Sequence, residues 1–328
     1  MTRDEDFCLY NRFPFLSPND SYLPIDVSKP LPIALFTPLT VNSATMTSID
    51  DKNAALMKAA VAGDIQTITK LLDSGAEVNY QLDGVTPVLA AATAGHLDAV
   101  TLLLDRGADV NARDASSRTI IKLALDNGHV ALAQALVKRY PNMIITDPRL
   151  PEGEAWLRKQ FQLITENVKD SLSKPNPDVL ERLIHWDLGP TENRSVSDTY
   201  WEHILLRYIG DIPLDIRRNY STELKLSLVG TFNCILTGHE GITESARLLN
   251  SKLPTTQYDI TETVIKQTGQ SGGWVTERWG YHDNNFQVTD GIDTFLIENS
   301  KITVKMINYN VVKAGSRSDY EKKIGLSK

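Results

Sequence analysis

The chain has 328 residues and a formal net charge of -7, with ordinary apolar and charged fractions. This length suggests two domains, and the acidic balance argues against a nucleic-acid-binding protein, which normally carries a basic face. The two cysteines, Cys8 and Cys234, form no disulfide or zinc pattern, and no apolar run reaches the ~20 residues of a membrane helix. We therefore expect a protein of the reducing cytoplasm without metal, cofactor, membrane or nucleic-acid partner.

The first 50 residues are rich in proline, serine and threonine. Prolines at this density prevent long helices. We expect an extended arm over residues 1–50, either disordered or laid over a domain, in which the run "LPIALF" is apolar enough to dock. The first residues, "MTRDEDFCLYNRF", are acidic and make a poor signal peptide.

Residues 51–145 repeat a pattern of helix, glycine turn and helix. Gly63, Gly95 and Gly128 follow one another at intervals of 32 and 33 residues. The clearest unit, "GVTPVLAAATAGHLDAVTLLLDRGADVN", opens its first helix with Thr86 and Pro87. These units resemble ankyrin repeats, about three of them. The third unit lacks the proline and ends in "KRYPNM", which is typical of a terminal cap.

The ankyrin resemblance implies an unknown protein partner, bound by the turn tips and the concave helix face. The residues expected to contact it are Tyr80, Gln81, Leu82 and Asp83 in the first tip, and Arg113 and Asp114 in the second tip. The alternative is that this short array only packs against the second half of its own chain, because three repeats are near the minimum for stability. His96 and His129 occupy equivalent positions and are interpreted as structural.

Further along, residues 146–198 contain amphipathic helical patterns and are predicted to form a helical connector. Residues 199–314 then give two helices broken at Gly210-Asp211, two strands joined at Gly230, a helix and four strands. This order indicates an α+β domain, in which a curved antiparallel sheet wraps around helices and can enclose a pocket. Residues 315–328 are expected to be a mobile tail.

Three stretches of this second domain resemble, in order and spacing, the SnoaL-like branch of the nuclear transport factor 2-like superfamily. They are "GDIPLDIRRNYSTELKLS", "GTFNCILTGHEGITESARLL" and "VTDGIDTFLIENSKITVKMINYNV". The resemblance covers residues 199–313 and implies a cone-shaped fold. The expected architecture is multidomain: an all-α ankyrin array followed by an α+β cone.

The superfamily includes ketosteroid isomerase, polyketide cyclases, epoxide hydrolases and dehydratases, and other members only bind or transport, so the fold does not settle function. Comparison with ketosteroid isomerase places Asp293 at its protonated acid, His203 at its tyrosine and Leu228 at its base carboxylate. Leucine cannot accept a proton, so that chemistry is expected to be absent. An acid–base pair of Asp293 and His203 stays open. The structural alternative is that Asp293 only caps a turn and that the hydrogen bonds of His203 are satisfied within the fold, so that neither residue takes part in catalysis.

The residues expected to line the pocket are Trp201, Phe232, Glu277, Trp279, Phe295 and Asn308.

Three hypotheses about the function of the whole chain are compatible with these observations. In the first, the ankyrin repeats recruit a protein while the SnoaL-like domain dimerises or binds a small hydrophobic ligand. In the second, an enzyme acts on a hydrophobic carbonyl compound with Asp293 and His203. In the third, both parts form one rigid body and the pocket is vestigial. The pairing of domains is compatible with a secreted effector, although no secretion signal is legible.

Overall fold

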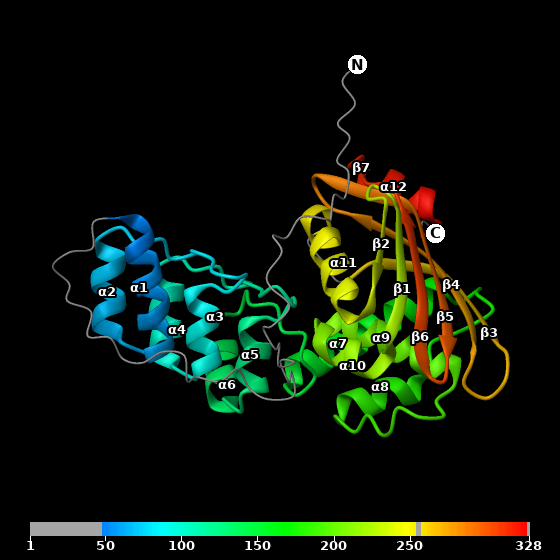
Figure 1. Ribbon diagram of the computed structural model, residues 1–328, viewed down its shortest axis with the longest axis horizontal. Coiled ribbons are helices and arrows are strands. Elements are labelled where there is room, and N and C mark those ends of the chain that lie inside the picture. Colours follow the sequence, from blue (N-terminus) through cyan, green and yellow to red (C-terminus); the bar gives the residue numbers. More distant parts are fainter. Residues whose placement is uncertain (1–47, 254–256, 327–328) are drawn as a thin grey trace, which may run out of the picture.

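The structure is a computed structural model, and it describes residues 48–253 and 257–326. The arm predicted over residues 1–50 therefore lies almost wholly outside the described residues. The described chain has a helical N-terminal part and a sheet-rich C-terminal part (Figure 1).

The N-terminal part stacks three pairs of helices side by side (Figure 1). The pairs are α1 (Ile49–Ala62) with α2 (Ile65–Asp73), α3 (Pro87–Ala94) with α4 (Leu97–Asp105), and α5 (Ile120–Asp126) with α6 (Val130–Arg139). The first helix of each pair starts after an extended Ser48, Thr86 or Thr119. These three N-caps place the starts of α1, α3 and α5 on one edge of the stack.

A glycine and a histidine join each repeat to the next. The Nε2 atom of His96 lies 3.0 Å from the carbonyl oxygen of Val61, and that of His129 lies 3.1 Å from the carbonyl oxygen of Thr93. Gly63 has a φ of 67° and faces the His96 ring so closely that a Cβ would lie 2.6 Å from it. The structural interpretation of both histidines is confirmed, and glycine is required by conformation and by space.

The C-terminal part is a sheet with helices packed against it. The helices are α7 (Pro151–Asn167), α8 (Pro177–Ile184), α9 (Val196–Ile209), α10 (Ile212–Asn219), α11 (Gly238–Lys252) and α12 (Arg317–Ile324). The strands are β1 (Tyr220–Gly230), β2 (Cys234–Thr237), β3 (Asp259–Gln267), β4 (Gly273–His282), β5 (Phe286–Glu298), β6 (Lys301–Tyr309) and β7 (Val312–Lys313). The strand order is β2-β1-β6-β5-β4-β3, with β7 on β5. The sheet is open and curved. All of its strand pairs are antiparallel, as expected, except that β1 and β6 run parallel, which the expected antiparallel sheet did not include.

The segment expected as a connector is part of the C-terminal core. Leu157 and Ile164 of α7 and Leu183 of α8 are buried in the same apolar cluster as α9 and the sheet. The loop after α7 also covers the outer strand β3, because the hydroxyl of Ser171 accepts from the Thr263 amide at 3.1 Å. Covering an edge strand protects its unpaired amides. The C-terminal unit thus begins at α7, and not at residue 199 as expected.

The third repeat packs directly on the C-terminal part. Lys122 of α5 is buried, and its Nζ lies 2.6 Å from Asp126 and 2.7 Å from Asp211 at the start of α10. The hydroxyl of Thr146 donates to the carbonyl oxygen of Ile209 at 2.9 Å. The last repeat therefore makes the intrachain contact foreseen in the alternative to partner binding.

The expected mobile tail contains a helix instead. In α12, Ser316 caps the first turn and Tyr320 is fully buried. The Tyr320 hydroxyl donates to Asp259 at 2.6 Å and lies beside Gly280 of β4. A single buried aromatic residue with partners 40–61 positions away leaves no local sequence pattern that distinguishes this packed helix from a mobile tail.

Replacement of Gly280 with alanine is expected to lower the free energy of unfolding by about 1–3 kcal/mol, as for other overpacked sites. A Cβ at this position would lie 2.6 Å from the Tyr320 hydroxyl and 3.0 Å from the Val288 carbonyl oxygen. Gly315→Ala is the control, since its Cβ meets nothing closer than 3.7 Å. Urea denaturation compares the two variants. Equal stabilities would contradict the packing of α12 on β4.

Candidate interaction surface and buried polar site

The first predicted tip is open. Gln81, Leu82 and Asp83 are exposed, Leu82 to 46%, whereas Tyr80 is half-buried. Leu82 pairs with Val85 in a short bridge, and Asp83 turns the chain with a φ of 51°. This turn holds an apolar side chain out into solvent, where a partner can reach it.

The second predicted tip is occupied by the chain itself. The guanidinium of Arg113 donates to the Ser117 carbonyl oxygen at 2.9 Å. The carboxylate of Asp114 accepts from the amides of Ser116 and Arg118 at 2.9 and 2.8 Å. Asn250 of α11 donates to the Ser117 hydroxyl at 3.1 Å. Arg113 and Asp114 thus build the turn that meets the C-terminal part, which leaves the first tip as the freer surface.

A buried polar cluster lies between α9 and the sheet. Tyr200, His203 and Arg207 are spaced by three and four positions, so they share one face of α9. Glu277 of β4 and Asp293 of β5 are direct partners in the sheet register and point to the same side. The ring of Phe295 lies 5.5 Å from those of Tyr200 and His203. The helix and sheet residues therefore meet in one interior.

The carboxylate that orients His203 is Asp215 of α10. The His203 Nδ1 atom lies 2.7 Å from Asp215 Oδ2, and both side chains are buried. Burial lowers the pKa of His203 to about 4, with opposition from Asp215. The ring is neutral near pH 7, so Nδ1 carries the proton toward Asp215 and Nε2 is left as an acceptor. The pairing of His203 with Asp293 anticipated from the sequence is replaced by His203 with Asp215.

Asp293 has its own partners. Its Oδ1 atom accepts from the Trp279 indole at 2.7 Å, and its Oδ2 atom lies 3.6 Å from Lys305 Nζ. The ammonium of Lys305 also lies 4.9 Å from the Phe295 ring centre. These contacts hold the Asp293 carboxylate in a buried ion pair with Lys305.

Glu277 is the carboxyl group that the interior perturbs most clearly. Burial and, to a smaller extent, the neighbouring Asp293 raise its pKa to about 7, with opposition from Arg207. The Tyr200 hydroxyl donates to Oε2 of Glu277. Such a carboxyl group is poised to accept or donate a proton near neutral pH.

Several buried polar atoms of this interior have no hydrogen-bond partner within the described chain. They are Trp201 Nε1, His203 Nε2, Arg207 Nε, Glu277 Oε1 and Tyr309 Oη. Leaving a buried polar group unpaired costs about 1–3 kcal/mol, and native proteins normally supply water or a ligand instead. These unpaired atoms belong to α9, β4 and β6, which leaves hydrogen-bonding capacity unused in this interior.

Five of the six residues expected to line a pocket are buried or half-buried in the core that contains this cluster. Trp201, Glu277, Trp279 and Phe295 are buried there, and Phe232 is half-buried against the same core. Asn308 was wrongly included, because it is exposed while its neighbours Ile307 and Tyr309 are buried. Strand alternation forces that result. The same alternation could have identified Lys305 as inward-facing, and helical spacing could have linked Tyr200 and Arg207 to His203.

Residues 48–253 and 257–326 contain no group of three or more His, Cys, Asp or Glu side chains arranged to hold a metal ion. Over the same residues, no helix is both long enough and apolar enough to cross a bilayer.

Comparison with known proteins bears on the repeats. No curated protein matches the chain. A family model of ankyrin repeats matches residues 44–147, in three copies. Together with the three helix pairs and the glycine–histidine contacts between them, this match identifies residues 44–147 as an ankyrin repeat array, a protein-interaction module.

Proposed function

We propose that this protein binds a protein partner through the first two ankyrin repeats, and a small, largely apolar molecule inside a C-terminal SnoaL-like cone. The unpartnered buried polar atoms of the C-terminal interior are the observation that carries the proposal of ligand binding. The proposal of partner binding is supported by the ankyrin repeats. Because the third repeat contacts the C-terminal part of its own chain, we assign the partner to the first two repeats.

The cone assignment is supported by the order of elements and by their packing. Two helices with a glycine corner precede the sheet, and α11 packs on β1 and β2. The strand pairs β3–β4, β4–β5 and β5–β6 are antiparallel, as in the resemblance drawn from the sequence. Fold alone does not assign a ligand, so the ligand is argued from the interior residues.

The interior favours a neutral ligand with an apolar body and a hydroxyl group. Trp201, Trp279 and Phe295 provide buried aromatic surface. The Nε2 atom of His203 and the Oε1 atom of Glu277 can accept a hydrogen bond, while Tyr309 can donate one. Lys305 and Arg207 act electrostatically on both His203 and Glu277, which supports a shared space. Apolar walls with a few convergent polar groups are typical of small-molecule sites.

Leu82→Asp is expected to weaken partner binding by about tenfold or more, the effect of losing one strong interface contact. The substitution places a charge on the exposed apolar side chain of the open first tip. Leu172→Asp is the matched control, because Leu172 is 87% exposed in the loop after α7. Affinity capture with the full chain as bait provides the measurement. Equal capture by both variants would place the partner elsewhere.

The second candidate function is acid–base catalysis on such a ligand. It is favoured by two groups of this interior, the Glu277 carboxyl group, whose pKa is raised to about 7, and the neutral His203 imidazole held by Asp215. These groups replace the pair of Asp293 and His203 proposed from the sequence. A bound ligand that gains carbon-bound deuterium in D2O would favour catalysis over binding alone.

The outer face of the sheet supports dimerisation as an additional role. Ile235, Met306 and Trp274 are exposed there to 76%, 48% and 46%. Ile235 and Met306 both lie opposite Ser227 in the register of their sheet neighbours, so they form one outward row. Ser227 lies between them in this row, and apolar side chains gathered on one exposed face are typical of an interaction surface.

A further inference from the structure

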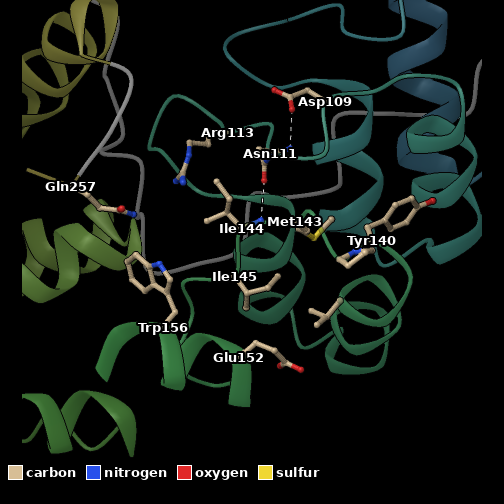
Figure 2. A pocket seen from close by; sticks show the side chains of 12 residues that line it. Asp109, Asn111, Arg113, Tyr140, Met143, Ile144, Ile145, Glu152, Trp156 and Gln257 are labelled. Atoms are coloured by element: carbon tan, nitrogen blue, oxygen red, sulfur yellow. Dashed lines mark hydrogen bonds between the residues drawn. The ribbon is translucent and has the colours of Figure 1, made fainter. Parts of the chain in front are cut away.

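A groove of about 1040 Å³ lies where the third repeat meets α7, away from the buried polar cluster. The repeat contributes Asn111, Arg113 and Tyr140, the connecting chain contributes Ile144, and α7 contributes Trp156. Figure 2 shows Ile144, Arg113 and Trp156 bordering the same hollow. Ile144 is 45% exposed although Met143 and Ile145 on either side are buried. The groove therefore presents an apolar, partly aromatic surface that the described chain leaves uncovered.

The groove wall is held in place by backbone contacts. The Asn111 side chain accepts from the Ile144 amide at 3.0 Å, and the Asp109 carboxylate accepts from the Asn111 amide at 2.9 Å (Figure 2). Gly153 has no room for a Cβ, which would lie 1.9 Å from the Asp147 carbonyl oxygen, so α7 begins tightly against this chain. A preformed wall loses little entropy on binding an extended segment.

We propose that this groove receives the chain's own residues 29–38, "KPLPIALFTP", folded back from the N-terminus. The segment combines three prolines with Leu31, Ile33, Leu35 and Phe36. Proline-rich apolar segments dock in aromatic-lined grooves because their backbone is already restricted to an extended form. The aromatic ring that would meet the prolines is that of Trp156.

Charge complements this apolar match. Asp109 and Glu152 are exposed carboxylates at the rim of the groove. Lys29 immediately precedes the apolar run and carries the opposite charge. An exposed pair of this kind contributes at most about 1 kcal/mol, so it fixes direction more than affinity.

The chain is long enough to make this contact. Ser48 caps α1 on the edge of the array where Thr119 caps α5, and Thr119 pairs with Arg113 of the groove. From α1 to α5 there are two helix spacings, because α3 packs between them, and this amounts to roughly 16–20 Å. Residues 39–47 separate the segment from Ser48, and nine residues span up to about 30 Å.

Photo-crosslinking of the full chain tests this contact. A benzophenone amino acid replaces Ile144 in the groove, and in a control chain it replaces Leu172, which is more exposed and lies in the loop after α7. The expected result is a crosslink from position 144 to residues 29–38. The double variant Leu35→Asp, Phe36→Asp is expected to lose it, and position 172 is expected not to form it.

A mixture of light and heavy isotope-labelled chains identifies whose segment is captured. Crosslinks within one chain support the inference, and mixed-isotope crosslinks would show the groove serving a second copy and overturn it. Capture of another segment at position 144, no capture, or equal capture at position 172 would also overturn it. None of these outcomes depends on a ligand in the buried polar cluster.

Discussion

Lys122→Met is expected to lower the free energy of unfolding by about 3–5 kcal/mol, the usual loss when one partner of a buried ion pair is removed. The Lys122 side chain is 3% exposed and lies 2.6, 2.7 and 3.8 Å from Asp126, Asp211 and Asp147. Arg149 still contacts Asp126 and Asp147 in the variant, so Asp211 is the carboxylate left without its cation. Urea denaturation of the full chain measures the loss.

Two controls separate charge from side-chain volume. Lys138→Met changes an exposed lysine of α6 and is expected to shift stability by no more than about 0.5 kcal/mol. Adding Asp211→Asn to Lys122→Met is expected to recover part of the loss, because asparagine removes the buried charge and still caps α10. Equal effects of Lys122→Met and Lys138→Met would refute the buried contact between the third repeat and α10.

The stability of Glu277→Gln relative to the unsubstituted chain is expected to rise between about pH 4.5 and 7. Folding raises the Glu277 pKa to about 7 from an ordinary 4.5. Between these pH values the folded unsubstituted chain binds more protons than the unfolded chain, so its stability falls as the pH rises. Glutamine removes that loss and can still accept from Tyr200. The relative slope is expected to reach at most about 1.4 kcal/mol per pH unit.

His203→Gln is expected to give the opposite slope. Burial lowers the His203 pKa to about 4 from an ordinary 6.5, so the unfolded chain binds more protons and stability rises with pH across that window. The variant lacks the imidazole and therefore this gain, so its stability relative to the unsubstituted chain is expected to fall as the pH rises from 4 to 6.5. Thermal or urea denaturation over pH 4 to 8 measures both differences. Curves parallel to that of the unsubstituted chain would show that neither group is buried as described.

The sequence repeats and the helix-capping residues made much of the fold predictable from the sequence. The spacing of Gly63, Gly95 and Gly128 reflects turns that recur in three stacked units. The expected break at Gly210-Asp211 is a helix start, since the Asp211 side chain caps α10 by accepting from the Leu214 amide. Strand alternation identified β3 to β6 because each has a buried face. These features depend on residues close together in the chain.

The contacts that define the buried site depend on distant residues. His203 and Asp215 meet because the chain turns sharply at Gly210, so α10 brings its carboxylate back to α9. Nothing in the local sequence distinguishes Asp215 from Asp293 as the partner of His203. The burial of Tyr320 depends on Gly280 and Asp259 in the same way. The positions of Asp215 and Tyr320 are therefore set by tertiary packing between distant segments, which no local sequence pattern reveals.

Native mass spectrometry of the full chain tests most directly the central claim, that the buried polar site holds a small molecule. We predict that the native mass exceeds the mass after denaturing desalting by that of one small molecule per chain. Glu277→Gln combined with His203→Gln is expected to lose this excess, and Glu298→Gln, at the exposed end of β5, is expected to keep it. Equal native and denatured masses, both as purified and after incubation with a metabolite extract, would contradict the claim.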